Sequence, residues 1–174
     1  NEDAQAALDD AKVLLELAPG LALAKLRKAE ANMMLSNWEE AKDDLEQIVE
    51  DAPHHHHALT QLASCFMAMD RPEKAEAPLN EALRLAPDHT EAWHQRGLLY
   101  LDWAQEESAL NDFEAAVRCD GNHLGARLRI AAIHHKAERF SEALGAWNGV
   151  LAIEPEHTVA RRRREECEMA LATI

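Results

Sequence analysis

Glycine, proline, cysteine and aromatic residues are all scarce in this chain of 174 residues, which has six Gly, six Pro, three Cys and 5% aromatic residues. Runs of β-branched residues are also rare, so the sequence disfavours a sheet, while Ala, Leu, Glu and Arg suit helices. No stretch approaches 18 consecutive apolar residues and no signal-peptide pattern opens the chain, which argues against membrane insertion. The first residue is Asn1 rather than Met, which leaves open that this is a piece of a longer protein.

Positive charge is also in short supply, because 18 Lys and Arg stand against 32 Asp and Glu, a net charge of −14. A general nucleic-acid binder needs a basic surface, and a polybasic membrane anchor needs clustered Lys and Arg, so both classes are excluded. Apolar residues make up 47% of the chain, which is enough to build a buried core.

The three cysteines, Cys65, Cys119 and Cys167, are odd in number and far apart, so they predict neither a disulfide framework nor a metal site. We expect buried free thiols, which favour a reducing compartment and a cytoplasmic location.

A period of 34 residues organises the whole sequence. Small residues that let two helices approach closely recur in two ladders, Ala7, Ala41, Ala75, Ala109, Ala143 and Ala24, Ala58, Ala92, Ala126, Ala160. Helix-ending residues recur with the same stride at Pro19, Pro53, Pro87, Gly121 and Pro155. Between the ladders, larger apolar residues are spaced by three, four and seven, as on a packed helix face.

The segment 90–123 carries a recognisable pattern, formed by Trp93, Gly97, Tyr100, Ala109, Phe113 and Ala116. In period and pattern it resembles the tetratricopeptide repeat (TPR), a 34-residue helix–turn–helix unit. Other segments are looser, with Leu59, Lys25 and Arg127 at the place of Trp93. The resemblance implies an all-α fold: an α–α superhelix of antiparallel helix pairs, with a concave groove lined by the first helix of each repeat.

The register predicts the organisation of the chain as a single array. Residues 1–21 supply the second helix of a truncated repeat, with Leu14, Leu15 and Leu17 at second-helix places. Full repeats occupy 22–55, 56–89, 90–123 and 124–157. Residues 158–174 form a capping helix with Ala160, Cys167, Leu171 and Ile174 on its inner side. The first helix lacks its partner, so either the chain continues upstream or another copy covers that face.

Catalytic patterns are absent from the sequence. There is no nucleophile–base arrangement, phosphate loop, HExxH or CxxC, so we predict no enzyme activity and no cofactor. Acidic runs such as Glu39–Glu40 and Asp43–Asp44 are spaced as a solvated helix face.

Histidine is unusually frequent, with ten copies, including the run His54–His57. His55, His89, His123 and His157 are again 34 apart, at the junctions between repeats. Equivalent places in packed helices lie about 10 Å apart, whereas zinc–nitrogen bonds are about 2 Å, so this ladder cannot share one ion. We interpret the ladder as polar turn residues and predict no metal site. Metal binding by the run and a pH-dependent interface remain alternatives.

The expected groove carries three ladders of candidate partner-binding residues. One offers hydrogen-bond donors: Arg27, Gln61, Gln95, Arg129 and Arg163. A second is largely apolar and flexible: Met33, Met67, Leu101, His135 and Met169. A third is mixed: Leu26, Thr60, His94, Leu128 and Arg162. They predict a half-apolar groove that binds a protein or peptide with acidic and apolar side chains.

These observations favour a non-catalytic protein–protein interaction or scaffold module. At the places where chaperone-tail-binding members of the family carry their clamp residues, only Arg129 agrees, so that subtype is not expected. The run Arg161–Arg164 opposes the macrodipole at a helix start, which suggests a nearby acidic partner, and i,i+4 pairs with Glu165, Glu166 and Glu168 are expected. The alternatives are self-association as a homo-oligomer through residues 1–21, or a targeting arm of a larger enzyme.

Overall fold

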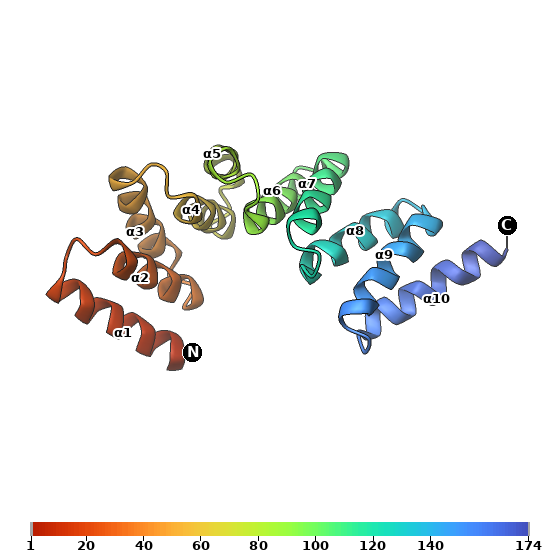
Figure 1. Cartoon of the computed structure of the whole chain (residues 1–174), viewed down its shortest axis with the longest axis horizontal. Coiled ribbons are helices and arrows are strands. Elements are labelled where there is room, and N and C mark those ends of the chain that lie inside the picture. The colour runs from red at the N-terminus through yellow and green to blue at the C-terminus, as the bar shows by residue number, and fades with distance from the viewer. Residues whose placement is uncertain (1, 174) are drawn as a thin grey trace. The chain divides into compact units, whose positions relative to one another are not determined.

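A computed structural model describes residues 2–173 of the chain, and within them it contains no strand. In this described part of the chain, ten α-helices follow one another, together with one short 3₁₀ segment, η1 (Figure 1). Their bounds are α1 Glu2–Leu17, α2 Ala22–Met34, α3 Trp38–Asp51, α4 His56–Ala68, η1 Pro72–Lys74, α5 Glu76–Leu85, α6 Thr90–Asp102, α7 Glu106–Cys119, α8 Leu124–Lys136, α9 Phe140–Ile153 and α10 Thr158–Ala172. No helix in this part of the chain is long and apolar enough to cross a membrane.

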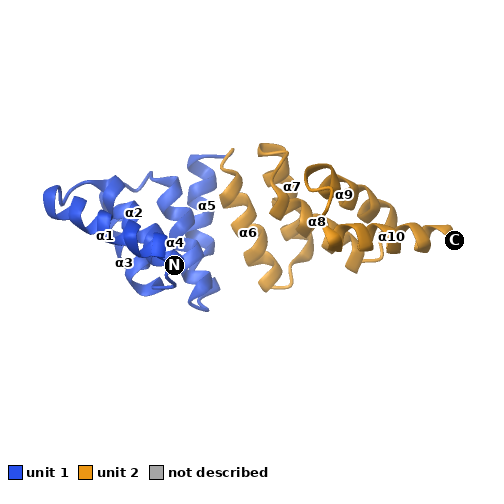
Figure 2. Cartoon of the chain, turned by 90° about the horizontal axis from the view of Figure 1, so that it is seen from below, with its two compact units in different colours: residues 1–87 blue, residues 88–174 orange. Residues whose placement is uncertain are grey.

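The chain divides into two compact units, which we call unit 1 (residues 1–87) and unit 2 (residues 88–174) (Figure 2). Unit 1 holds α1 to α5 and unit 2 holds α6 to α10. Inside each unit every helix packs against the next one along the chain. Packing of each element on its neighbours in sequence is what a stacked-repeat architecture requires.

The two alanine ladders lie where helices make their closest contacts. Ala41, Ala75, Ala109 and Ala143 are all 0% exposed, and in the other ladder Ala24 is 1% exposed while Ala58, Ala92, Ala126 and Ala160 are 0% exposed. In unit 2, Ala109 and Ala126 join Phe113 in one hydrophobic cluster, and Ala143 and Ala160 join Trp147 and Val150 in another. Ala7 is the exception. It is exposed, so its prediction as a contact residue is wrong, because α1 packs through Ala4, Leu8 and Ala11 instead.

The turns inside the repeats share one backbone conformation. Ser36, Asp70, Ala104 and Glu138, again 34 apart, have φ values of 62°, 58°, 57° and 56°. Each directly follows the C-cap of a helix, where a left-handed residue lets the chain leave the helix and turn back. None of the four is glycine, so the repeat geometry imposes this conformation against the local preference of the side chain.

The histidine ladder occupies the N-caps of α4, α6, α8 and α10. The Nδ1 atoms of His55, His123 and His157 accept hydrogen bonds from the backbone N–H groups of Ala58, Ala126 and Ala160 at 3.1, 3.0 and 3.1 Å. His89 holds the same place before α6 without a side-chain cap hydrogen bond. These histidines are therefore helix caps, a role more specific than the polar turn residue that we predicted.

Three further predictions about burial are wrong. Cys119 is exposed, whereas Cys65 and Cys167 are buried as expected. Asp44 does not lie on a solvated face, because it is only 9% exposed and pairs with Lys28 at 2.8 Å. Leu171 is 37% exposed rather than internal, and Ile174 lies outside the described residues.

Candidate functional site

One stripe of α8 lines a set of adjoining hollows on the surface of unit 2. Its residues are spaced by three and four along the helix: Gly125, Leu128, Arg129, Ala132, His135 and Lys136. Three hollows, of about 450, 390 and 220 Å³, share Ala132. Ala132 is small, so the hollows adjoin above it. We call the set the α8 groove.

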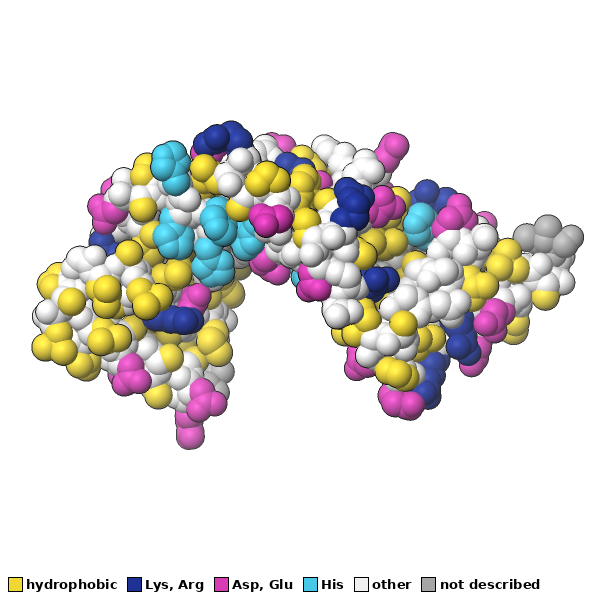
Figure 3. All heavy atoms as spheres, viewed as in Figure 1, with side chains coloured by type: hydrophobic (Ala, Val, Ile, Leu, Met, Phe, Trp, Pro, Cys, Tyr) yellow, Lys and Arg dark blue, Asp and Glu magenta, His cyan; other side chains and the backbone are white. Residues whose placement is uncertain are grey.

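The walls of the α8 groove come from the neighbouring helices. The largest hollow is closed by Trp147 of α9 with Val159 and Arg163 of α10. His94 of α6 borders the second hollow, and Leu101 and Glu106 border the third. Figure 3 shows basic, acidic and hydrophobic side chains interspersed over unit 2. The groove therefore combines apolar surface with charged groups at its rim.

Arg129 is the distinctive charge of the groove. It is exposed, it lines two of the three hollows, and its guanidinium has no hydrogen bond or ion pair with any residue in the range 2–173. The other cations are engaged: Lys136 forms an ion pair with Glu106, and Arg163 donates to Glu166 at 2.8 Å. A planar guanidinium with five donors is thus available to a carboxylate or to backbone carbonyls.

A Cys–His–Glu arrangement lies beside the groove. His135 Nδ1 is 3.3 Å from Cys167 Sγ, and its Nε2 is 3.4 Å from Glu166 Oε2. The thiol is nevertheless 0% exposed, and burial together with the charge of Glu166 raises the pKa of Cys167. A nucleophilic cysteine needs an accessible thiolate, so this arrangement is a packed contact.

Six of the predicted partner-binding residues meet in the α8 groove: His94, Leu101, Leu128, Arg129, His135 and Arg163. Two more belong to unit 2 but lie outside it. Gln95 donates to Glu91 at 2.6 Å, and Met169 is 64% exposed.

The predicted residues of unit 1 do not line these hollows. Arg27 pairs with Glu30 at 2.8 Å, and the Gln61 amide lies 3.3 Å from Glu30 Oε1. Met33 and Met67 are half-buried. Leu26 and Thr60 are 8% and 1% exposed, so their prediction as groove residues is wrong. Contact between Arg27, Gln61, Met33 or Met67 and a partner stays a prediction.

Sequence reasoning missed seven residues of the groove: Glu106, Gly125, Ala132, Ile133, Lys136, Trp147 and Val159. Ala132 and Lys136 follow Leu128 and Arg129 at helical spacing, so extending the stripe along α8 would have found them. Trp147 comes from a second helix, and only the packing of α9 on α8 brings it to the surface hollow.

The basic run of α10 forms two of its three predicted pairs. Arg162 lies 3.7 Å from Glu166 and Arg164 lies 3.4 Å from Glu168. Arg161 instead pairs with Glu156, before the helix, and its Nε donates to the carbonyl of Pro155. The run is therefore largely neutralised by residues of its own end of the chain.

Comparison with protein families gives two matches, both described as tetratricopeptide repeat, over residues 35–97 and 90–123. Among solved structures, a thermophilic TPR protein of Thermus thermophilus is 20% identical, with a TM-score of 0.79, over 95% of this chain and 91% of that one. The protein MamA is 19% identical, with a TM-score of 0.76, over 90% and 92%. YrrB, a TPR protein with an unusual peptide-binding site, is 22% identical, with a TM-score of 0.70, over 94% and 84%. No curated protein sequence matches the chain.

Proposed function

Because the chain belongs to the tetratricopeptide repeat family, with an all-α fold of the TPR superhelix type, we propose that it is a non-catalytic module that binds a partner peptide. The α8 groove of unit 2 is the proposed site. The observation that carries the proposal is the guanidinium of Arg129, which has no partner among the described residues and lies at the edge of an apolar hollow. Neighbours of the same fold include YrrB with its peptide-binding site.

The chemistry of the groove specifies the peptide. Leu128, Trp147 and Ala132 offer apolar contact, and Arg129 offers a bidentate partner for a carboxylate. Unit 2 is also the less acidic half, with ten Lys and Arg against fifteen Asp and Glu, compared with eight against seventeen in unit 1. The proposed ligand is a segment that places an acidic side chain within a few residues of an apolar one.

The division into repeats is part of the same proposal. It is supported by the first residues of α2, α4, α6, α8 and α10, which lie 34 apart at Ala22, His56, Thr90, Leu124 and Thr158.

The cytoplasmic location stays a prediction.

A peptide-binding assay tests the proposal. Fluorescently labelled decapeptides that combine Glu and Leu are titrated with the protein, beside peptides in which Lys replaces every Glu, and anisotropy is measured. We expect the acidic set to contain binders, and Arg129→Ala to weaken them about tenfold, the value of one charged hydrogen bond.

The matched control is Arg118→Ala, which removes an exposed Arg of α7 that does not line the groove. It should leave the affinity unchanged. Equal binding of the acidic and basic peptides, or equal losses from the two substitutions, would contradict the proposed site.

Self-association is the second candidate function, favoured by an apolar patch on unit 1. Val13, Leu14 and Leu17 of α1, with Leu21 and Leu23 just after it, are 41 to 80% exposed. Clustered apolar side chains of this size on a surface commonly mark an interaction site.

A further inference from the structure

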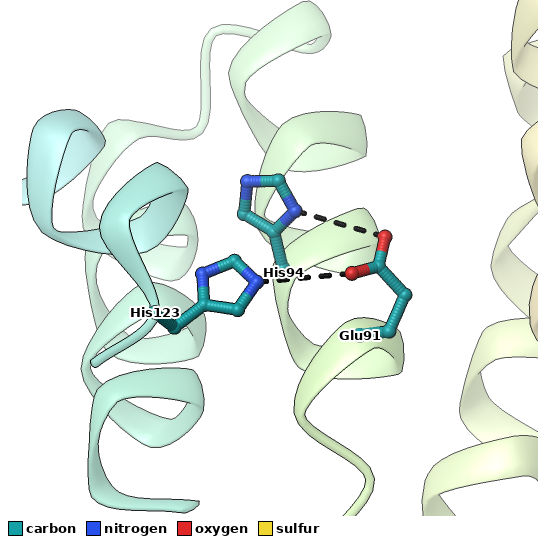
Figure 4. Close-up of side chains that lie close together, drawn as sticks. All are labelled: Glu91, His94 and His123. Atoms are coloured by element: carbon teal, nitrogen blue, oxygen red, sulfur yellow. Dashed lines mark ion pairs between the residues drawn. The ribbon is translucent and has the colours of Figure 1, made fainter. Parts of the chain in front are cut away.

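Three metal-ligating side chains converge in unit 2 at the edge of the α8 groove (Figure 4). Glu91 and His94 stand one turn apart on α6, and His123 precedes α8 as its N-cap. One oxygen or nitrogen atom from each residue lies within 4.8 Å of the other two. The packing of α8 on α7, and the approach of its first turn to α6 at Gly125 and His94, bring the second imidazole to a carboxylate 32 residues away in sequence.

The distances within this cluster suit an ion better than a hydrogen bond. His94 Nδ1 is 3.9 Å from one Glu91 oxygen, and His123 Nε2 is 3.7 Å from the other. Both separations exceed hydrogen-bond length. Ligand atoms around a four-coordinate zinc ion lie roughly 3.3 Å apart, since each bond is about 2.0–2.2 Å. Side-chain rotations that move the three ligand atoms inward by on the order of 1 Å would therefore bring them to these distances.

The Nδ1 atom of His94 and the lowered pKa of Glu91 also suit the binding of a cation. His94 Nδ1 is buried and has no hydrogen-bond partner among the described residues, so its position facing Glu91 is otherwise unused. Burial raises the pKa of Glu91, but the polar interactions with His94 and Gln95 outweigh it and hold the pKa below its ordinary value. The Gln95 amide also orients the carboxylate through its 2.6 Å hydrogen bond, as the outer partners of metal ligands do.

We propose that Glu91, His94 and His123 bind a single divalent transition-metal ion, with Zn²⁺ as the best fit. Two imidazoles and one carboxylate form a ligand set that zinc accepts readily in a tetrahedral site. A fourth ligand such as water would enter from the side of Glu91, whose side chain is 46% exposed. His94 borders both this site and the proposed peptide site, but Arg129 belongs to the peptide site alone, so the two proposals can fail separately.

Binding at His123 has a consequence for the start of α8. His123 Nδ1 accepts the hydrogen bond of Ala126 N–H at 3.0 Å, so the proton of the neutral ring sits on Nε2. Zinc needs the lone pair of Nε2, so that proton has to leave Nε2 and Nδ1 has to take one up. The ring stays neutral, but the cap of α8 loses its acceptor. Zinc binding and capping by His123 therefore exclude each other.

The run His54–His57 is the competing site for any added metal. Figure 3 shows histidine side chains gathered in the region of α4. Their rings are partly engaged, since His55 caps α4 and His57 lies 3.4 Å from Glu30. A test of the proposal therefore needs a readout that belongs to the Glu91 cluster alone.

Calorimetric titration of the full chain with ZnCl₂ at pH 7.5 provides the first test. We expect one tight equivalent, and about a hundredfold loss of affinity in His94→Ala, Glu91→Gln and His123→Asn. Asn is itself a good N-cap, so His123→Asn removes the ligand while the helix keeps its cap. His157→Asn, at the matching cap of α10, and His54→Ala are the controls and should bind as the wild type does. Circular dichroism checks that each variant is folded, and His94→Gln replaces His94→Ala if that variant is not.

Backbone hydrogen exchange provides the second test. Zinc should speed exchange at Ala126 several-fold, while Ala160, which His157 caps, should not change. The proposal is overturned if the wild type takes up no tight equivalent, or if His94→Ala binds zinc as the wild type does. It is also overturned if only His54→Ala loses binding, which would assign the metal to the histidine run.

Discussion

At the scale of single residues, the histidines show how one side chain serves different purposes in repeated surroundings. His55, His123 and His157 cap helices through the same nitrogen. Only His123 also faces a carboxylate, because Glu91 lies one repeat earlier on the neighbouring first helix. The capping role recurs with the 34-residue period, whereas any additional role of a histidine depends on the side chain that it faces.

The three thiols differ in exposure, and this predicts their reactivity. Burial raises the pKa of Cys65 to about 11, so at pH 8 roughly one molecule in a thousand carries that thiolate. Burial also raises the pKa of Cys167, whereas Cys119 is exposed. We expect one thiol per chain to react quickly with Ellman's reagent at pH 8, and three after unfolding in urea.

Cys119→Ser is the control for this measurement. It should remove the fast reaction and leave the two slow thiols of the folded chain. Fast reaction of all three thiols in the native wild type would show that the packing around Cys65 and Cys167 opens readily, contrary to the burial described above.

At the scale of helices, two glycines offer a matched test of packing. A Cβ added at Gly97 in α6 would lie 2.6 Å from the ring of Phe113, which is 0% exposed, so the ring or the helix would have to shift. A Cβ at Gly145 in α9 would meet no described atom within 4 Å apart from the backbone of its own helix and its chain neighbours. Alanine is the better helix former at both places, so the difference between them isolates the effect of close approach.

We expect Gly97→Ala to lower the free energy of unfolding by about 1–3 kcal/mol, because overpacking outweighs the gain in helix propensity. Gly145→Ala should raise it by about 0.5–1 kcal/mol. Urea denaturation followed by circular dichroism measures both. If both substitutions stabilise the protein, the contact between α6 and α7 is looser than the structure shows.

Sequence periodicity predicts helices well here because the cause is local. The 34-residue ladders give the helices, their order and their small contact residues, and the left-handed turn residues follow with the same stride. The pair Lys28–Asp44 was missed, since charged residues on a helix usually face water and only packing shows that this carboxylate is enclosed.

The candidate site was predicted only in part, for a related reason. Arg129, Leu128 and His135 share one helix face, so their neighbourhood follows from spacing. The meeting of Glu91 with His123 depends on how α8 packs beside α6, which no single-helix pattern contains. The sequence does show Glu91 and His94 at i,i+3, on one face of a helix. That pair alone does not predict a metal site, because the third ligand, His123, is found only from the packing.

At the scale of the whole molecule, the unused surfaces of the two units differ in character. Unit 2 offers a groove with a cation that has no partner among the described residues, whereas unit 1 offers apolar side chains on α1, in the turn after it and at the start of α2. The net charge of −14 disfavours random association of chains, so any self-association requires a specific apolar contact.

Sedimentation velocity over a hundredfold range of concentration tests that contact. If the α1 patch is a self-association surface, the wild type should shift from monomer to a larger species as its concentration rises. Leu17→Glu should keep the protein monomeric, because a charge placed within an apolar interface costs several kcal/mol unless it is paired. Leu17 is 80% exposed, so the substitution leaves the core intact.

The matched control is Met34→Glu, at a residue of α2 that is 65% exposed and outside the patch. A monomer at every concentration, or equal effects of the two substitutions, would reject self-association through α1.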